Sequence, residues 1–437
     1  MKTLDEFYRT MKYRGLLHFS LVVALTACSG GVASLPGTSG VPLAMPAVQE
    51  DAPSAHRIKH VIILVQTNRS FDNLFGHFPG ADGAKSGLMS DGTVIKLKKT
   101  KLYDPKLYQN SHQAFLVEYD GGKMDRWNLV YVNLAPCSTC AYAFVDPKQI
   151  KPYWTLAKQY VLADHMFSTE SSGDFTAHQD LIRGNSAINT TESLIDFPSR
   201  GPWGCDAPAG TTTPLLTNTG QYIPNGPPPC MTYNTLRDLL DAKHVSWKYY
   251  TPNIFTSLAG AYWGAFDAIS AVRYGPEWKT NVSTPETNIF KDIKKGQLSD
   301  VSWVMPSDVH SDHAGFGSFD AGPAWVAKVV NAVGTSKYWD SSAIIVVWDD
   351  WGGWYDHVPP PQLDYAGLGF RVPMIVVSPY AKQGFISHTQ YEFGSIIRLI
   401  EDNWNLGSLG TTDTRAAKIK DAFNFAQKPR AFVPVPK

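Results

Sequence analysis

The sequence has no excess of either charge, because 39 lysine and arginine residues are balanced by 39 aspartate and glutamate residues. A neutral chain has no general attraction to polyanions, so nothing in the overall charge indicates a nucleic-acid partner. Charged residues make up 18% of the chain and apolar residues 43%. This composition can bury a large core and excludes a disordered or fibrous protein.

The sequence also lacks an apolar run long enough to cross a membrane. Residues 16–25 form a short apolar run interrupted by His18, whereas a membrane span needs about 20 apolar residues. Because Lys12 and Arg14 precede it, this run is typical of a secretory signal. It ends in Leu-Thr-Ala-Cys at residues 25–28, which resembles a bacterial lipobox. We therefore expect residues 1–27 to be removed and Cys28 to be lipidated, with an ordinary cleaved signal as the alternative.

The segment after this cysteine has the composition of a tether. Residues 28–55 are rich in glycine, serine, alanine and proline and have no apolar periodicity. Without residues 1–27, the chain has 35 basic against 37 acidic side chains, a count of −2. The sequence thus predicts an exported lipoprotein, held at the outer membrane, in the periplasm or at the cell surface by an N-terminal lipid anchor.

Cysteine is scarce, with five in the whole chain. Besides Cys28 there are Cys137, Cys140, Cys205 and Cys230, and an even number in an exported chain predicts two disulfides. Three pairings are possible. A zinc site at the CxxC of Cys137 and Cys140 is the weaker alternative, because Cys205 and Cys230 do not form a second CxxC.

Short β-branched apolar runs alternate with helical patterns. The runs predict strands buried on both faces of a largely parallel sheet, at residues 58–65, 299–305, 343–348 and 372–377. Helices are expected between and after them, at residues 235–242, 324–333 and 391–403. This alternation predicts an α/β fold with helices on both sides of the sheet.

No polar linker interrupts the strand-like runs, so we expect one domain over residues 56–415. A cysteine-stapled insertion near residues 200–230 and a C-terminal tail at 416–437 complete the predicted organisation. The oligomeric state does not follow from the sequence.

Acidic residues follow the predicted strands. In open α/β sheets, ligands bind beyond the carboxyl ends of the strands. The run at 343–348 leads directly into Asp349 and Asp350, then a Gly-Gly turn, then Asp356 and His357, a composition suited to a divalent cation. Each carboxylate taken alone could cap a helix or a turn. Further clusters at 310–313 and 164–178 would meet the first at one sheet edge, which favours a site.

Three segments carry a resemblance to a known family. They are NRSFDNLFG with FPGADG at residues 68–83, WDDWGGWYDHVPP at 348–360, and RVP, SPY and HTQY between residues 371 and 391. Together they resemble the bacterial phospholipase C/acid phosphatase phosphoesterase family, over about residues 56–415.

The resemblance implies a three-layer α/β/α sandwich of the alkaline-phosphatase-like type. It also implies hydrolysis of phosphate esters, phospholipids included, by metal-assisted attack of a side-chain hydroxyl on phosphorus. Asn68, Asp349 and Asp350 would bind a divalent cation or phosphoryl oxygens, and His313 and His112 would bind phosphate or protonate the leaving group. Such roles suit phosphoryl transfer, which needs positioning and charge neutralisation.

Two positions depart from the family pattern. Thr67 stands where the family has a metal-binding Glu, and Asp174 stands where it has a Ser or Thr nucleophile. One alternative is a degenerate lipoprotein that binds phosphate esters without turnover. A second is an exchange of roles, with Asp174 attacking phosphorus or ligating the metal and Thr67 coordinating weakly. In a third, the register of this loop differs, and Ser172 or Thr176 attacks.

We favour an active phosphoric ester hydrolase. The predicted catalytic residues are Asp174, His313 and His112, and the predicted metal ligands are Asn68, Asp349, Asp350 and Thr67. Since Asp174, Asp349 and Asp350 would repel one another without a cation, the sequence predicts dependence on a divalent metal.

Overall fold

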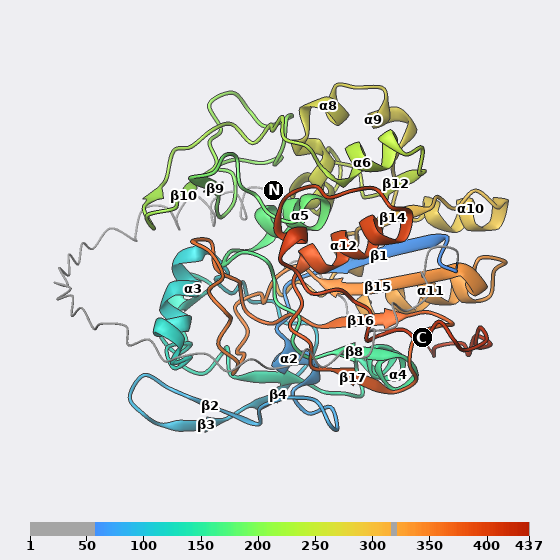
Figure 1. Cartoon of the computed structure of the whole chain (residues 1–437). Helices are drawn as coiled ribbons and strands as arrows, with labels where there is room; N and C mark the ends of the chain where they lie inside the picture. The colour runs from blue at the N-terminus through green and yellow to red at the C-terminus, as the bar shows by residue number, and fades with distance from the viewer. Residues whose placement is uncertain (1–56, 316–320, 437) are drawn as a thin grey trace, which may run out of the picture.

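Eight strands of the described chain form one sheet in the order β13-β12-β14-β1-β15-β16-β8-β17 (Figure 1). The computed structural model describes residues 57–315 and 321–436, so the predicted signal, Cys28 and the tether lie outside the described residues. The central strands are β14 (Val301–Val304), β1 (His60–Gln66), β15 (Ser342–Trp348) and β16 (Met374–Val377). The flanking strands are β12 (Trp247–Tyr250), β13 (Val282–Ser283), β8 (Val161–Ala163) and β17 (Phe385–Ser387).

The four predicted strands are confirmed, but one of them runs against the others. Strand β16 pairs antiparallel with both β15 and β8, whereas the other pairings of this sheet are parallel. A parallel neighbour needs a crossover, usually through a helix. The segment at 349–373 between β15 and β16 contains no helix. It stays at one edge of the sheet, so β16 must begin where β15 ends.

Helices cover both faces of the sheet and confirm the predicted α/β/α layers (Figure 1). On one face α5 (Asp174–Arg183) packs against α12 (Phe393–Trp404), and on the other α4 (Lys151–Gln159) packs against α11 (Gly322–Gly334). Helix α12 starts at a capping box formed by Glu392 and Ser395 and buries its apolar stripe. The remaining α-helices are α2 (Phe71–Phe75), α3 (His112–Tyr119), α6 (Leu236–Ala242), α7 (Leu258–Trp263), α8 (Ser270–Arg273), α9 (Glu277–Thr280) and α10 (Asn288–Lys295).

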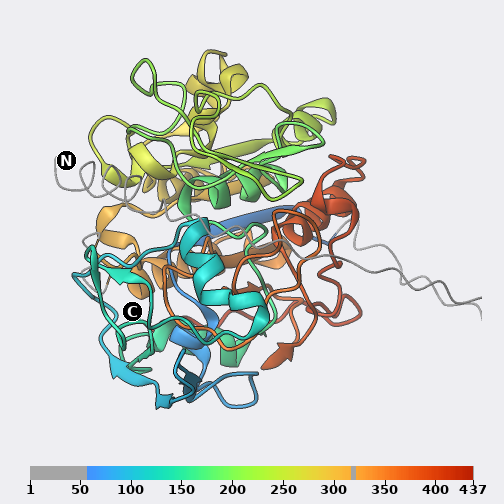
Figure 2. The same ribbon diagram turned by 90° about the vertical axis from the view of Figure 1, so that its left-hand side faces the viewer.

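A separate layer, which we call the cap and define as residues 86–145, lies beyond the carboxyl ends of the parallel strands (Figures 1 and 2). It holds α3 and the short strands β2 (Ser86–Leu88), β3 (Val94–Lys96), β4 (Lys98–Thr100), β5 (Tyr131–Val132), β6 (Ala135–Pro136) and β7 (Ala143–Val145). Much of the cap packs in two small apolar clusters, which rest on Trp351, Trp354 and Tyr355. The cap is thus seated on the segment that follows β15.

The predicted insertion contributes β10 (Leu215–Thr217) and β11 (Tyr222–Ile223) to a small separate sheet, whose third strand, β9 (Glu192–Leu194), precedes the insertion. Both predicted disulfides are present and join Cys137 to Cys140 and Cys205 to Cys230. This pairing leaves none of these four cysteines for zinc.

The main apolar core extends from Ile58 to Val435. It includes Ile419 and Phe423, so part of the segment at 416–436 packs on the body of the domain. None of the helices in the described ranges combines the length and apolarity that a membrane span requires.

Candidate active site

The site begins where β1 and β15 end side by side. Their parallel register sets Gln66 opposite Trp348, so Asn68 leaves the sheet beside Asp349 and Asp350. The backbone N–H of Asn68 donates to Asp349 Oδ1 at 2.8 Å, and its side-chain amide donates to both oxygens of Asp350 at 3.2 and 3.3 Å. Asn68 has φ of 59°, a left-handed conformation that asparagine tolerates better than most residues. The backbone thereby turns the asparagine toward the carboxylates.

A third carboxylate comes from Asp174, the first residue of α5. Its backbone N–H donates to Asp350 Oδ2 at 2.8 Å, and its φ is 30°. One oxygen each from Asp174, Asp349 and Asp350 lies within 4.8 Å of the others, and all three residues are buried. The structure therefore brings together three of the predicted site residues, which we call the open cluster.

The groups that face the open cluster are almost all uncharged. The Asn110 amide donates to Asp174 Oδ2 and to Asp350, each at 3.2 Å, and Trp263 Nε1 donates to Asp174 Oδ1 at 3.3 Å. Two histidines also face the cluster: His178 Nε2 is 3.2 Å from Asp349 Oδ2, and His313 Nε2 is 3.9 Å from Asp174 Oδ1. Within the described ranges, no lysine or arginine forms an ion pair with any of the three carboxylates.

Burial and mutual repulsion shift the proton affinities of these groups. Burial raises the pKa of Asp349 well above its usual range, and the charge of Asp174 raises it further. Asp350 behaves in the same way, with burial and then the charges of Asp349 and Asp174 raising its pKa. Burial lowers the pKa of His178 to about 4, despite the opposing charge of Asp174, and also lowers that of His313. These histidines are neutral near pH 7, so they do not balance the carboxylates.

The chemistry of the open cluster fits a divalent cation. Asn68 Oδ1 and Asp349 Oδ2 are buried oxygens that accept no well-aligned hydrogen bond within the described residues, although His178 Nε2 lies 3.2 Å from Asp349 Oδ2. Such atoms are costly to leave unsatisfied, and carboxylate and amide oxygens are the ligands that hard divalent cations prefer. The residues present could therefore hold a cation, whose identity the donor atoms do not specify.

The other predicted site residues surround the open cluster without joining it. Thr67 Oγ1 lies 2.7 Å from Ser311 Oγ, so this hydroxyl is already paired. His112 Nδ1 lies 3.0 Å from both the carbonyl and the hydroxyl of Ser171, in the loop that leads to Asp174. In the same loop, Ser172 Oγ donates to Asp196, and Thr176 Oγ1 donates to the carbonyl of Gly173. The side chain set against Asp349 and Asp350 is that of Asp174.

Sequence reasoning missed Asn110 and Trp263 as parts of the site, and it placed His178 in the cluster at 164–178 without giving it a role. His178 follows Asp174 by one helical turn, a spacing that could have indicated it. Asn110 and Trp263 come from the cap and from α7, and no local pattern marks either residue.

A second group of carboxylates lies at the same edge of the sheet, and we call it the closed cluster. It consists of Asp72 and Asp356 with His357. Arg371, fully buried three residues before β16, donates from Nε to Asp356 Oδ1 at 2.8 Å and from Nη2 to Asp72 Oδ1 at 3.4 Å. His357 Nδ1 lies 2.7 Å from Asp72 Oδ2. Cationic side chains of this chain thus already occupy the closed cluster.

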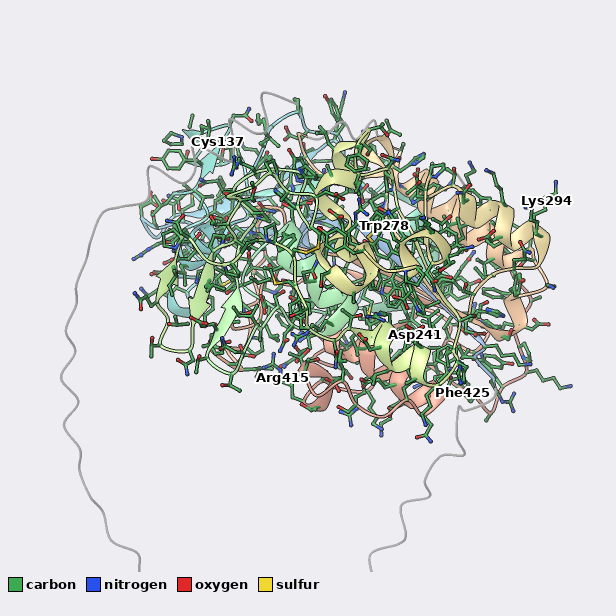
Figure 3. All side chains as sticks on the ribbon, turned by 90° about the horizontal axis from the view of Figure 1, so that it is seen from above. Cys137, Asp241, Trp278, Lys294, Arg415 and Phe425 are labelled. Carbon is green, nitrogen blue, oxygen red and sulfur yellow. A yellow bond between two sulfur atoms is a disulfide. The ribbon has the colours of Figure 1, made fainter. Side chains whose placement is uncertain are left out.

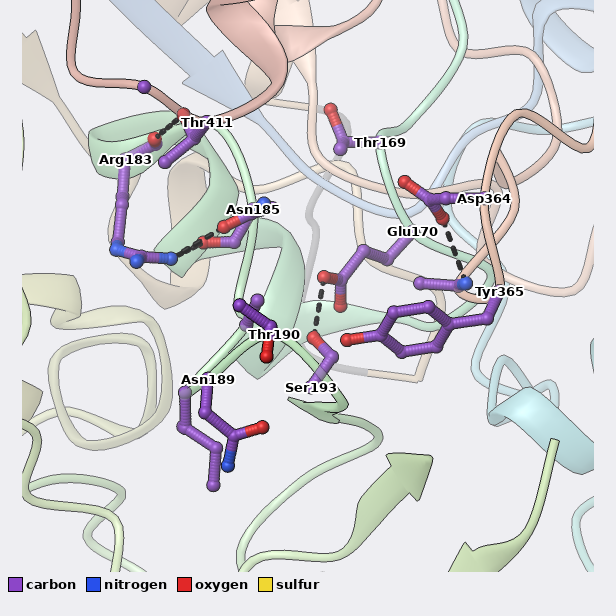
Figure 4. A pocket seen from close by; sticks show the side chains of 14 residues that line it. Thr169, Glu170, Arg183, Asn185, Asn189, Thr190, Ser193, Asp364, Tyr365 and Thr411 are labelled. Carbon is purple, nitrogen blue, oxygen red and sulfur yellow. Dashed lines mark hydrogen bonds between the residues drawn. The ribbon is translucent and has the colours of Figure 1, made fainter. Parts of the chain in front are cut away.

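A cavity of about 390 Å³ lies behind the loop that precedes Asp174 (Figure 4). Glu170 borders it and accepts hydrogen bonds from Ser193 Oγ at 2.8 Å and from the backbone of Ser186 at 2.9 Å. Burial raises the pKa of Glu170 to about 7. None of the open-cluster carboxylates lines this cavity, so it is separate from the candidate active site.

Comparison with known proteins gives one consistent class. The family model of the phosphoesterase family matches residues 58–407. Phospholipase C B of Mycobacterium tuberculosis is 22% identical over 439 residues, covering 86% of this chain and 80% of that protein. Non-hemolytic phospholipase C of Pseudomonas aeruginosa is 23% identical, covering 90% of this chain and 60% of that protein. Non-specific phospholipase C3 of Arabidopsis thaliana is 23% identical, covering 87% of this chain and 76% of that protein.

Among solved structures, a protein of the alkaline phosphatase superfamily from Vibrio parahaemolyticus has a TM-score of 0.39 at 9% identity. That match covers 84% of this chain and 72% of the other.

Taken with the site, the sequence matches define a hydrolase of phosphoric esters. The chain belongs to the phosphoesterase family.

Proposed function

We propose that this protein is a phospholipase C, which cleaves the bond between phosphorus and the glycerol oxygen of a phospholipid at the open cluster. The observation that carries the proposal is the meeting of Asp174, Asp349 and Asp350, where Asp349 Oδ2 and the adjoining Asn68 Oδ1 accept no well-aligned hydrogen bond within the described residues. Support for the substrate class comes from the bacterial and plant relatives, whose names are those of phospholipases C.

A divalent cation held by Asn68, Asp349 and Asp350 would offset charge on the phosphoryl oxygens. The work of the chain's own residues is then to position the phosphorus and to move protons. Asn110 fixes both Asp174 and Asp350 through hydrogen bonds at 3.2 Å. Trp263 holds the other oxygen of Asp174. The Asp174 side chain is therefore oriented by hydrogen bonds from two neighbours rather than left free to rotate.

Asp174 takes the place of the family's hydroxyl nucleophile. In the first step, one of its carboxylate oxygens bonds to phosphorus, and the glycerol oxygen leaves and takes a proton from water. In the second step, water attacks phosphorus, and the bond to Asp174 breaks to restore the carboxylate. The water's proton goes to Nε2 of His313 and then to solvent. His313 suits this role because its Nδ1 lies 2.6 Å from the carbonyl of Ala314 and donates its proton there, which leaves Nε2 as the acceptor nitrogen.

The test compares wild type with Asp174→Asn, Asp174→Ala and Asp174→Ser on a phospholipid and on bis(p-nitrophenyl) phosphate, with added divalent metals. We expect wild type to turn over both, and Asp174→Asn to lose about a thousandfold or more in rate. Hydroxylamine should trap an aspartyl phosphate on wild type but not on Asp174→Asn. Activity gained in Asp174→Ser and absent from wild type would support a binding protein without turnover instead.

The tether and lipid anchor complete the proposal. Two disulfides within the described residues suit an oxidising compartment, which agrees with export. Expressed in a bacterial host with its own leader, wild type should partition into detergent and Cys28→Ser into the aqueous phase. Equal partitioning of the two would contradict lipidation at Cys28.

A further inference from the structure

The cap carries an unusual share of the exposed apolar surface. Of the 13 large apolar side chains exposed in the described ranges, eight lie in the cap, although it is less than a fifth of the described chain. Scattered single apolar residues are normal on a soluble protein, but a concentration in one layer marks a binding surface. The position of these side chains within the cap decides whether they form one surface.

Helix α3 shows the feature most clearly. It buries His112, Phe115 and Glu118 on its inner face, and Glu118 accepts a hydrogen bond from Trp351 at 2.9 Å. Its outer face presents Leu116 and Val117, which are 48% and 37% exposed. A surface helix normally turns polar residues to solvent. The outer face of α3 therefore has the character of a surface that is covered by something apolar.

Hydrogen bonds hold together the cap segments that carry the other exposed apolar residues. Ser90, two residues after the hairpin residue Leu88, donates from its backbone to Asn128 Oδ1 at 3.1 Å and accepts from Asn128 Nδ2 at 2.9 Å, and Asn128 precedes Leu129. Gln109, just before α3, donates to the carbonyl of Tyr131 at 3.3 Å. Leu88, Leu129 and Tyr131 are exposed like the outer residues of α3. We call these exposed side chains, Leu88, Leu116, Val117, Leu129 and Tyr131, the apolar face of the cap.

The apolar face borders the candidate active site. Asn110, which binds Asp174 and Asp350, is two residues before α3, and His112 starts the helix. Figure 2 looks onto this side of the molecule and shows α3 at its centre. Figure 3 shows Cys137 of the cap far from Lys294 of α10, which lies toward the other end of the strands. A binding partner docked on the apolar face would therefore lie next to the open cluster.

The charge of the cap points to the kind of partner. Its seven basic side chains are all exposed, at Lys96, Lys98, Lys99, Lys101, Lys106, Lys123 and Arg126. Of its five acidic side chains, only Asp91 is exposed. Lys99, Lys123 and Arg126 form ion pairs with Asp146 and Asp120, which leaves four of the exposed lysines without such a pair among the described residues. Exposed apolar side chains and exposed lysines in the same layer match an anionic lipid surface, where the apolar side chains enter the acyl boundary and the lysines meet the headgroups.

We propose that the apolar face of the cap docks onto an anionic phospholipid bilayer, and that this docking delivers a lipid to the open cluster. The inference rests on the proposed phospholipase function for its purpose, but the docking can be measured without catalysis. Docking through the cap also differs from lipid anchoring, because it uses folded residues next to the site and responds to salt.

The experiment uses the full chain with Cys28→Ser, so that the lipid anchor does not contribute. The α3 variant is a double substitution that makes the two exposed apolar side chains of α3 acidic, Leu116→Glu with Val117→Glu. The matched control is Phe255→Glu, which changes an apolar residue that is 67% exposed outside the cap. Binding is measured by co-sedimentation with phosphatidylcholine vesicles, with and without phosphatidylglycerol. A second variant, Lys98→Glu with Lys101→Glu, tests the charge without touching α3.

We expect the parent chain and Phe255→Glu to bind anionic vesicles. The α3 variant should bind them at least about tenfold more weakly. The lysine variant should weaken binding mainly at low salt. Hydrolysis of bis(p-nitrophenyl) phosphate should be unchanged in both cap variants, which shows that they are folded. Equal vesicle binding by the parent and both cap variants would overturn the proposal, as would selective loss in Phe255→Glu. Vesicle binding without hydrolysis of any ester would contradict the phospholipase function and leave the docking surface standing.

Discussion

Two groups of buried carboxylates lie at the same edge of the sheet, and they differ in what faces them. In the closed cluster, Asp72 and Asp356 meet the guanidinium of Arg371 and the imidazole of His357. In the open cluster, Asp174, Asp349 and Asp350 meet the amides of Asn68 and Asn110, an indole, and histidines whose pKa values are lowered. Cationic side chains of the chain balance the negative charge of the closed cluster, whereas no lysine or arginine among the described residues pairs with the open cluster.

This difference shows which acidic cluster has room for a cation from outside the chain. Buried charges need a partner, and where the chain supplies none, protons or an external cation must do so. The closed cluster fixes the start of β16 to the segment after β15, so its role is structural. The open cluster is the one that can accept a metal and a phosphate ester.

The largest expected effect is on activity. Asp350→Asn should lower hydrolysis of bis(p-nitrophenyl) phosphate by about a thousandfold or more, because it removes charge from the group that neutralises the reacting phosphoryl. The metal-free variant should melt no lower than metal-free wild type, since a repulsion is relieved. The control is Asp340→Asn, which changes an exposed aspartate just before β15. Undiminished turnover by Asp350→Asn would remove the open cluster from catalysis.

The closed cluster should respond in the opposite way. Asp356→Asn leaves the buried Arg371 with too little negative charge, and breaking such a pair costs about 3–5 kcal/mol of unfolding free energy. Denaturant unfolding measures this loss, and Asp356→Asn with Arg371→Met should recover part of it. A stable Asp356→Asn protein would mean that Arg371 is balanced elsewhere and that the two clusters differ less than their contacts indicate.

Metal removal comes next in size. A cation at one hundred times its Kd adds about 2.7 kcal/mol to the stability of the folded state. A chelator should therefore lower the melting temperature of wild type, and a divalent metal should restore it. In Asp350→Asn the shift should be much smaller, whereas Asp340→Asn should behave as wild type. A melting temperature independent of chelator would place the cation elsewhere or nowhere.

The smallest effect is a pH dependence of the closed cluster. Burial lowers the pKa of His357, but the hydrogen bond to Asp72 and the charges of Asp72 and Asp356 outweigh burial and raise the pKa above 6.5. As pH rises, His357 therefore keeps its proton in the folded protein to a higher pH than in the unfolded chain. Its stabilisation is complete below about pH 6.5 and is lost as pH rises through the raised pKa, by at most about 1.4 kcal/mol for each unit of pKa shift.

Thermal unfolding of the metal-saturated protein from about pH 6 to about pH 9 measures this slope. His357→Gln should reduce the slope by the contribution of one titrating group. His244→Gln, which changes a histidine exposed on the surface, should leave it unchanged. The same slope in wild type and His357→Gln would assign the titration to another residue.

The sequence allowed the sheet and the three carboxylates of the open cluster to be predicted, for a physical reason. Runs such as residues 343–348 are buried on both faces and end in carboxylates, so their position at a sheet edge follows from their pattern. Asn110 and Trp263 could not be predicted, because they reach the site from the cap and from α7 through contacts that no periodicity encodes. The direction of β16 could not be predicted either, because a buried apolar run has the same pattern in a parallel and in an antiparallel strand.

The sequence distances within the open cluster set an order on folding. Asn68 contacts Asp350 across 282 positions, and Asp174 contacts it across 176. Contacts of such long range form only after the intervening loops close. No nascent chain that ends before β15 can assemble the three carboxylates, so the site cannot capture a metal during early synthesis. Any cation must enter after the sheet has closed, in the compartment where the whole chain folds.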